Sequence, residues 1–196
     1  MTKKSTIKAA VICNADYFNE RAAAWDGMVH HDPAKVSAII AALNIGPADA
    51  VLDVGCGTGV LAPYLHDKCG SVLAVDEAEK MIEVAASKYQ YTNVEFKTIS
   101  FEKLAGKFDK IIMYSVFPHF EDKKAAIVHA ASLLKRGGRV MIAHSQSRER
   151  INSRHVEMGL VLPSPDEFTA LFSVAGLTVT ACVDTDEMFY VIGEKG

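Results

Sequence analysis

The amino-acid sequence predicts an α/β fold: a seven-stranded, mostly parallel sheet with helices on both faces and a reversed last strand. Three observations predict it. From residue 32 onward, runs with helical spacing alternate with short apolar runs. The run 51–55 ends in closely spaced glycines, as at a sharp strand-to-helix turn. Only residues 184–187 separate the last two strand-like runs, and so short a link requires antiparallel pairing.

The first regular element is a helix that begins after Asp32-Pro33, a cap residue followed by a first-turn proline. The apolar residues of this helix recur at helical spacing, at Val36, Ile39, Ile40 and Leu43. Gly46-Pro47 ends the helix. Five strand candidates follow, at residues 51–55, 71–76, 94–98, 110–114 and 139–144.

Helices are expected in the intervals between these strands. One apolar stripe consists of Ile82, Ala85, Ala86 and Tyr89. A second stripe, ahead of a stop at Gly137-Gly138, consists of Ile127, Ala131 and Leu134. Strands that alternate with helices in this way are typical of parallel pairing.

The C-terminal part begins with a capping box, Ser164 to Glu167, which opens a helix closed by Gly176. The residues expected to face inward are Phe168, Leu171, Phe172 and Ala175. Strand-like runs at 177–183 and 188–192 complete the seven strands.

Length and composition indicate one globular domain, with 196 residues of which 49% are hydrophobic and 23% charged. No apolar run approaches the roughly 20 residues that span a bilayer, and the polar start lacks the pattern of a signal peptide, so a cytoplasmic location is expected. Four cysteines without CxxC spacing indicate reduced thiols. A net charge of -3 gives no basic footprint for nucleic acid, so small molecules are the expected partners. Oligomeric state stays open.

The most informative motif is the run from Val51 to Gly59, in which three glycines are spaced by single residues. A bare backbone at the end of a strand suits a nucleotide-like cofactor. A dinucleotide fingerprint would place its third glycine at the position of Val60. Asp53 also puts a carboxylate near the ligand, which suits a cation better than a phosphate.

Four segments in order, 51–59, 72–76, 108–114 and 133–140, resemble motifs of the class I S-adenosylmethionine-dependent methyltransferases. The resemblance runs from about Asp49 to His144 and is strongest to the small-molecule group that includes the ubiquinone/menaquinone biosynthesis enzymes. It implies a Rossmann-like sheet, S-adenosylmethionine as the cofactor and methyl transfer to a small molecule. Residues 1–32 resemble the family's variable lid, and 33–196 would form the S-adenosylmethionine-binding methyltransferase domain.

The resemblance places the cofactor along the carboxyl ends of the first strands. Asp76 ends the second strand, where an acid accepts hydrogen bonds from ribose hydroxyls. Ser100 stands where the family often has an acid, so its hydroxyl and the backbone of Phe101 are expected to contact the adenine. The cofactor residues implied are Tyr17, Asp53, Gly55, Gly57, Thr58, Gly59, Asp76, Glu77, Met81, Ser100, Phe101 and Tyr114.

Two histidines lie just beyond the fourth and fifth strands, where open α/β sheets bind ligands. We therefore expect His119 and His144 to be catalytic, although His144 can equally cap its strand. The residues expected to bind the substrate are Trp25, His31, His119, His144, Arg148 and His155. If residues 147–158 form a helix, the face with Arg148 and His155 is either a solvated surface or a lid over the substrate.

Histidines are common metal ligands, but their spacing in this sequence does not form a metal-binding pattern. His30 and His31 are adjacent, and no HxH or HxxxH spacing occurs, so no metal site is expected. His66 and His129 fall on helices and are expected at the surface. Two alternative functions stay open: a non-catalytic domain that senses S-adenosylmethionine or its demethylated product, and an NAD-linked oxidoreductase, which the loop spacing and Asp53 disfavour.

Overall fold

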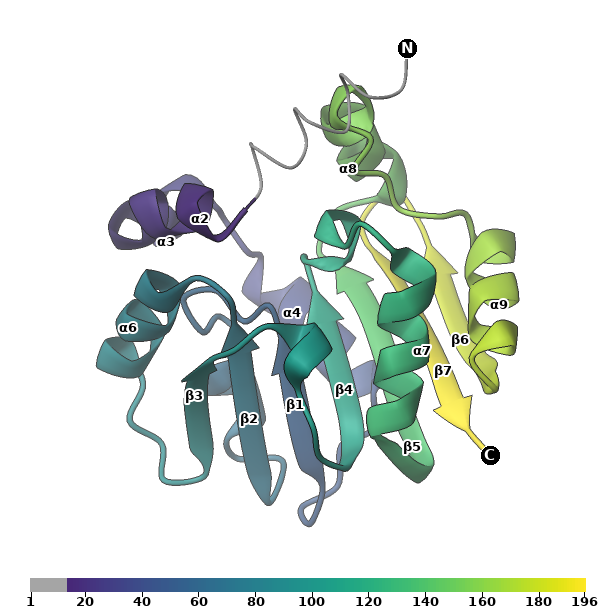
Figure 1. Cartoon of the computed structure of the whole chain (residues 1–196), viewed down its shortest axis with the longest axis horizontal. Coiled ribbons are helices and arrows are strands. Elements are labelled where there is room, and N and C mark those ends of the chain that lie inside the picture. The colour runs from purple at the N-terminus through teal and green to yellow at the C-terminus, as the bar shows by residue number, and fades with distance from the viewer. Residues whose placement is uncertain (1–13) are drawn as a thin grey trace.

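A computed structural model describes residues 14–196 as one seven-stranded sheet flanked by helices (Figure 1). The strand order is β3-β2-β1-β4-β5-β7-β6. The strands are β1 (Ala50–Val54), β2 (Ser71–Asp76), β3 (Val94–Thr98), β4 (Phe108–Tyr114), β5 (Leu134–His144), β6 (Leu177–Asp184) and β7 (Phe189–Lys195). The pairs from β3 to β5 are parallel, and β7 runs antiparallel to both β5 and β6. The predicted fold class, with its reversed last strand, is confirmed.

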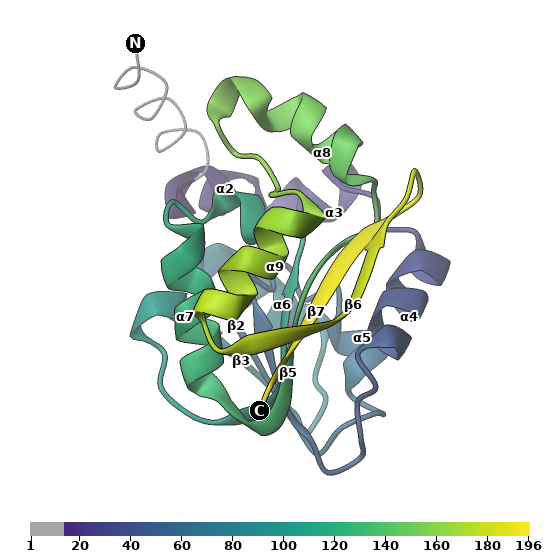
Figure 2. The same cartoon turned by 90° about the vertical axis from the view of Figure 1, so that its right-hand side faces the viewer.

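Both faces of the sheet are covered, which is the reason the central strands read as continuous apolar runs. On β4, Ile111 and Met113 belong to one core cluster while Ile112 and Tyr114 belong to the other. The first cluster packs under α7 (Lys123–Leu133) and α9 (Pro165–Val174). The second packs against α4 (Pro33–Ala42), α5 (Ala62–Leu65) and part of α6 (Glu79–Lys88). Figure 2 shows the two sets of helices on opposite sides of the sheet.

Local capping chemistry confirms two helix starts. The Asp32 side chain accepts hydrogen bonds from the N–H groups of Ala34 and Lys35 and so caps α4. Ser164 and Glu167 form the predicted capping box at the start of α9.

The C-terminal limit of α7 differs from the prediction. The helix ends at Leu133, and Leu134 is the first residue of β5, where it pairs with Phe108. The predicted stop at Gly137 lies inside this longer strand. A register shift between Phe108 and Lys110 accommodates the early start of β5. On α6, Ala86 is exposed rather than part of the buried stripe. Neither difference alters the sheet order.

The segment ahead of α4 forms short helices that lie over α6. They are α2 (Ala15–Arg21), the 3-10 turn η1 (Ala22–Ala24) and α3 (Trp25–Met28). Ala22 is buried with Ala78 and Met81 in a small apolar cluster that joins this segment to α6. On the other side of the same sheet edge stands α8 (Arg148–His155), as Figure 1 shows. Within residues 14–196, no helix has the length and apolarity needed to cross a membrane.

Candidate functional site

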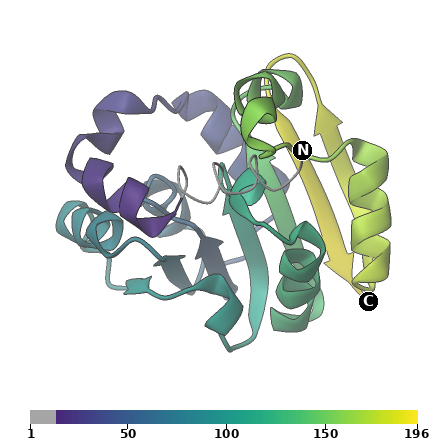
Figure 3. The same cartoon turned by 45° about the horizontal axis from the view of Figure 1, so that its top comes forward.

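A cavity of about 800 Å³ opens at the carboxyl ends of the parallel strands. Residues from α2 and α3 line one side, and residues at the end of β5 and on α8 line the other. Figure 3, with this edge brought forward, shows α2–α3 and α8 on either side of the strand ends. The volume of the cavity falls in the range typical of small-molecule and cofactor sites.

The glycine loop after β1 forms the floor of the cavity, and its glycines have different surroundings. Gly55, Gly57 and Gly59 all have positive φ, of 67°, 53° and 81°. A Cβ at Gly55 would lie 2.4 Å from Cγ2 of Val116. A Cβ at Gly57 would meet no atom within 4 Å, so the space above this residue is open. Gly59 faces α6 and does not line the cavity. Gly55 thus permits close packing, and Gly57 leaves room for a ligand.

Asp76, at the end of β2, holds the loop in place. One carboxylate oxygen accepts the N–H of Gly57 at 2.9 Å, and the other accepts the N–H of Ala78 at 2.9 Å. Asp76 also lines the cavity, where its oxygens retain lone pairs for a ligand. Burial raises the pKa of its carboxyl, in opposition to these two N–H groups, which lower it.

Asp53 is buried beneath the loop and does not line the cavity. Burial, with a smaller contribution from the charge of Asp76, raises its pKa to about 7. Near neutral pH this side chain is therefore poised between its neutral and ionised forms. A cation in the cavity would favour the ionised form.

The end of β3 differs from the expectation for Ser100. The Ser100 hydroxyl does not line the cavity and instead donates a hydrogen bond to Glu102. Phe101 and Glu102 line the cavity because the 3-10 turn η2 (Phe101–Lys103) turns them toward it. Reasoning from the sequence missed Glu102, an acid two positions beyond the place where one was sought.

His129 is a second correction, because it was expected at the surface. Its ring lines the cavity, with its centroid 4.8 Å from that of Phe101. Its Nε2 atom is buried, and no hydrogen-bond partner is present among the residues that the structure describes. The signal was available: His129 lies three and four residues after Ala126 and Ala125, which also line the cavity from α7.

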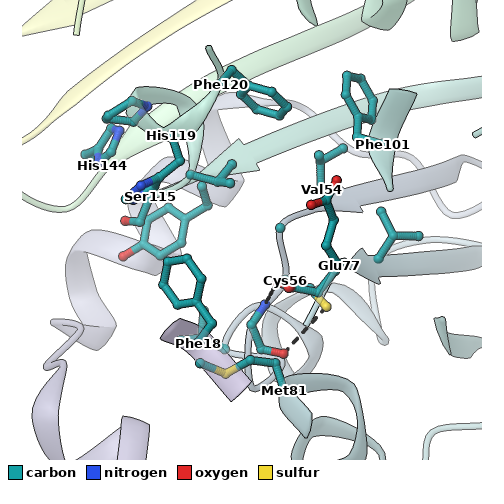
Figure 4. Close-up of a pocket in the computed structure, with 18 of the residues that line it drawn as sticks. Phe18, Val54, Cys56, Glu77, Met81, Phe101, Ser115, His119, Phe120 and His144 are labelled. Atoms are coloured by element: carbon teal, nitrogen blue, oxygen red, sulfur yellow. Dashed lines mark hydrogen bonds between the residues drawn. The ribbon is translucent and has the colours of Figure 1, made fainter. Parts of the chain in front are cut away.

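The aromatic residues of the N-terminal segment close over the cavity. Tyr17, Phe18 and Trp25 all line it. The ring of Phe18 makes edge-on contacts with Tyr17 at 5.3 Å, Trp25 at 5.4 Å and His119 at 5.7 Å between centroids. Phe18 thus links α2 to the opposite side of the cavity (Figure 4).

A polar contact fastens the same segment to the glycine loop. Thr58 donates a hydrogen bond from its hydroxyl to the Asp26 carboxylate at 2.5 Å. Lys88 pairs with the same carboxylate and also donates to the backbone oxygen of Thr58 at 3.2 Å. Residues 15–28 are therefore tied to the loop that would bind the cofactor.

A chain of three side chains crosses the end of the central strands. Nδ1 of His31 lies 2.9 Å from the hydroxyl of Tyr114, which donates to Ser145 at 2.8 Å. Burial lowers the pKa of His31 and raises the pKa of Tyr114, so both side chains are neutral near pH 7. All three line the cavity.

His119 and His144 come together as the sequence predicted. His119 ends the 3-10 turn η3 (Phe117–His119) after β4, and His144 ends β5. Figure 4 shows both residues on one side of the view and Phe101 on the other. Both line the cavity.

The face of helix α8 that lines the cavity differs from the face predicted from the sequence. Nε of Arg148 donates to Asp184 at 2.7 Å, and Arg148 does not line the cavity. The side-chain amide of Asn152 donates to the backbone oxygen of Leu162 at 3.0 Å and accepts the N–H of Leu162 at 2.7 Å. The side chain of His155 lies outside the described part of the chain. The residue of α8 that lines the cavity with a charge is Arg154, which the sequence analysis missed.

The site thus gathers most of the predicted residues at one place. Those that line the cavity are Tyr17, Trp25, His31, Gly55, Gly57, Thr58, Asp76, Glu77, Met81, Phe101, Tyr114, His119 and His144. Among the described residues, those that do not are Asp53, Gly59, Ser100 and Arg148. The described side chains contain no group of three or more His, Cys, Asp or Glu arranged to hold a metal ion.

Curated relatives match the central part of the chain. A ubiquinone biosynthesis O-methyltransferase of Xanthomonas axonopodis pv. citri is 34% identical over 119 residues, which are 57% of this chain and 49% of that protein. The enzyme of the same description from Acinetobacter baylyi is 34% identical over 100 residues, 47% of this chain and 42% of that protein. The match therefore spans less than half the length of these relatives.

Solved structures agree over nearly the whole chain. The magnesium protoporphyrin IX methyltransferase of Synechocystis, with bound S-adenosylmethionine, has a TM-score of 0.69 and 20% identity, and covers 100% of this chain and 99% of its own. The DhpI complex with S-adenosylhomocysteine has a TM-score of 0.76 and 19% identity, and covers 100% and 99%. These likenesses confirm the fold.

The family model described as "Methyltransferase domain" matches residues 45–176, from the link before β1 to the end of α9. This range contains the glycine loop, Asp76, and the strand ends that line the cavity. The chain therefore belongs to the class I S-adenosylmethionine-dependent methyltransferase family.

Proposed function

We propose that the chain is an S-adenosylmethionine-dependent methyltransferase that acts on a small molecule. The observation that carries this proposal is the pairing of Asp76 with the open face of Gly57 at one end of the cavity. A carboxylate that holds a bare glycine loop, with lone pairs left for ribose hydroxyls, fits an adenosyl group.

The residues present fit the cofactor at each of its parts. Asp76 would accept the ribose hydroxyls, and Phe101 and Met81 would pack against the adenine. Asp53 and Asp76 place negative charge close to where a cationic methionine moiety would lie. When bound, S-adenosylmethionine supplies a methyl group on a positively charged sulfur.

The other half of the cavity would hold the methyl acceptor. His119 and His144 face this space, and either is placed to contact the acceptor or to take a proton from it. Tyr17, Phe18 and Trp25 would exclude water, and their ring faces would favour the cationic sulfur. We propose that the segment within residues 1–32 acts as a lid and that Asp26 holds it on the loop.

A cofactor sensor without catalysis is the alternative from another class. Such a sensor requires only the part of the cavity around the glycine loop and Asp76, which we call the donor half. The neighbouring half, with His119, His144 and the chain from His31 to Ser145, favours an enzyme because polar groups converge there on space beyond the cofactor.

The two loop glycines allow the donor site to be tested apart from the fold. Gly57→Ala is expected to lower the affinity for S-adenosylhomocysteine at least tenfold, because the new methyl group enters open cavity space. Because φ is positive at position 57, the alanine should also cost about 1–2 kcal/mol of stability. Gly55→Ala should cost about 3 kcal/mol or more, because strain adds to overlap with Val116. Calorimetric titration and thermal melting measure the two effects, and wild-type affinity in Gly57→Ala would contradict this placement.

The proposed function is tested first by ligand-dependent melting. S-Adenosylmethionine and S-adenosylhomocysteine at 100 times their dissociation constants should each stabilise the protein by about 2.7 kcal/mol, and NAD should not. Labelled S-adenosylmethionine is then incubated with the protein and a metabolite extract. Transfer of label to a small molecule separates an enzyme from a sensor. Stabilisation by NAD alone would sink the assignment.

A further inference from the structure

The charged residues that line the cavity are not evenly spread. Carboxylates stand around the donor half, at the ends of β2 and β3, where Asp76, Glu77 and Glu102 line the wall. On the side formed by the end of β5 and by α8, the charged group is the guanidinium of Arg154. No lysine and no second arginine lines the cavity among residues 14–196. The α8 side of the cavity therefore carries a cationic group that the donor half lacks.

Arg154 is available to a ligand. Its Nη1 donates to the side-chain oxygen of Gln146 at 3.1 Å, and Gln146 also lines the cavity. No carboxylate of the described residues pairs with Arg154, whereas Arg148, one turn and a half earlier, is paired with Asp184. A guanidinium has five N–H donors in a planar fork that matches oxyanions.

Two further carboxylates, Glu121 and Asp122, also line the cavity, from the loop between His119 and α7. One oxygen of Asp122 accepts the N–H of Ala125 at 2.8 Å, as the cap of α7. Glu121 is exposed at the rim. At the ends of β4 and β5 the lining consists of the hydroxyl groups of Tyr114, Ser115 and Ser145, beside His119 and His144.

We propose that the methyl acceptor carries an oxyanionic group, a carboxylate or a phosphate-like group, which binds Arg154 and Gln146 at the α8 side of the cavity. This inference rests on the proposed function and adds the chemical class of the acceptor. An anion at this place is attracted by Arg154 and by the positive charge of the bound donor, and it is kept apart from Asp76 and Glu77. Ile151, next to Arg154 in the wall, gives the uncharged part of the acceptor an apolar contact.

The test compares charged and neutral molecules of nearly equal shape. The protein is saturated with S-adenosylhomocysteine and melted at constant ionic strength with 20 mM acetate or acetamide, benzoate or benzamide, and phenylphosphonate or its dimethyl ester. We expect at least one anion to raise the melting temperature by about 3 °C above its neutral counterpart, as for a ligand about tenfold above its dissociation constant.

Arg154→Gln should weaken the anion's binding by about fivefold to tenfold and so reduce this difference to less than half. Arg150→Gln is the matched control, because Arg150 lies on the same helix, is exposed and does not line the cavity. The inference is overturned if every anion behaves as its neutral counterpart, or if Arg154→Gln keeps the full shift. If S-adenosylhomocysteine by itself did not raise the melting temperature, the proposed function would fail. Failure of the proposed function is therefore distinguishable from failure of the oxyanion site.

Discussion

Replacement of Asp76 by alanine is expected to abolish measurable binding of S-adenosylmethionine and S-adenosylhomocysteine. The variant loses the carboxylate proposed to accept two ribose hydroxyls, and hydrogen bonds to a charged group contribute about 1.5–3 kcal/mol each. It also leaves the N–H groups of Gly57 and Ala78 without their acceptor, so the loop itself loses support. The combined loss corresponds to a fall in affinity of more than about 100-fold.

Calorimetric titration with S-adenosylhomocysteine measures this loss. Circular dichroism and thermal melting establish that the variant is folded. Asp67→Ala provides a control for a surface carboxylate, since Asp67 is exposed and pairs with Lys68. Affinity within threefold of the wild type would show that Asp76 does not hold the donor.

Replacement of Asp53 by asparagine is expected to remove a large part of the pH dependence of stability. In the folded protein the pKa of Asp53 is about 7, because the side chain is buried, against 3.8 for an exposed aspartate. Below pH 3.8 the group is protonated in both states, and this contribution to stability is fully present. As pH rises toward 7, the unfolded chain releases the proton first, so the free energy of unfolding falls. The fall between pH 5 and 8 is about 3 kcal/mol.

Denaturant unfolding of the wild type and Asp53→Asn at pH 5, 6, 7 and 8 measures this difference. The variant should gain stability relative to the wild type as pH rises. Burial raises the pKa of Asp53, and binding of the cationic donor should lower it. The wild type should therefore release a proton when the donor binds near neutral pH. Titrations in buffers of different ionisation enthalpy detect that proton. Parallel stability profiles for the two proteins would refute the role of Asp53.

The candidate donor site was largely predictable because its chemistry is local in the sequence. The glycines and Asp53 lie within nine residues, and Asp76 ends the next strand. Parallel strands bring their carboxyl ends to one edge, so the order of elements alone places these groups together. The same rule brought His119 and His144 to one side of the cavity.

The errors share a physical cause, which is that helix rotation and turn geometry depend on packing. His129 looks like a surface residue on α7, and only the seating of α7 on the sheet turns it toward Phe101. The helix face predicted from the sequence contains Arg148 and not Arg154. The rotation of α8, set by the buried Ile151 and by the bonds of Asn152 to Leu162, sends Arg148 to Asp184 and Arg154 to the cavity.

The sequence by itself determined the sheet, its reversed last strand, and a glycine loop with two acids fit for a cationic adenosyl donor. Periodicity, capping residues and loop length act over short distances along the chain, and they were sufficient for these features. Tertiary structure decided that the N-terminal helices are tied to the loop through Asp26 and that Arg154 lines the α8 side of the cavity. Those features depend on how separate elements pack, which no local pattern encodes.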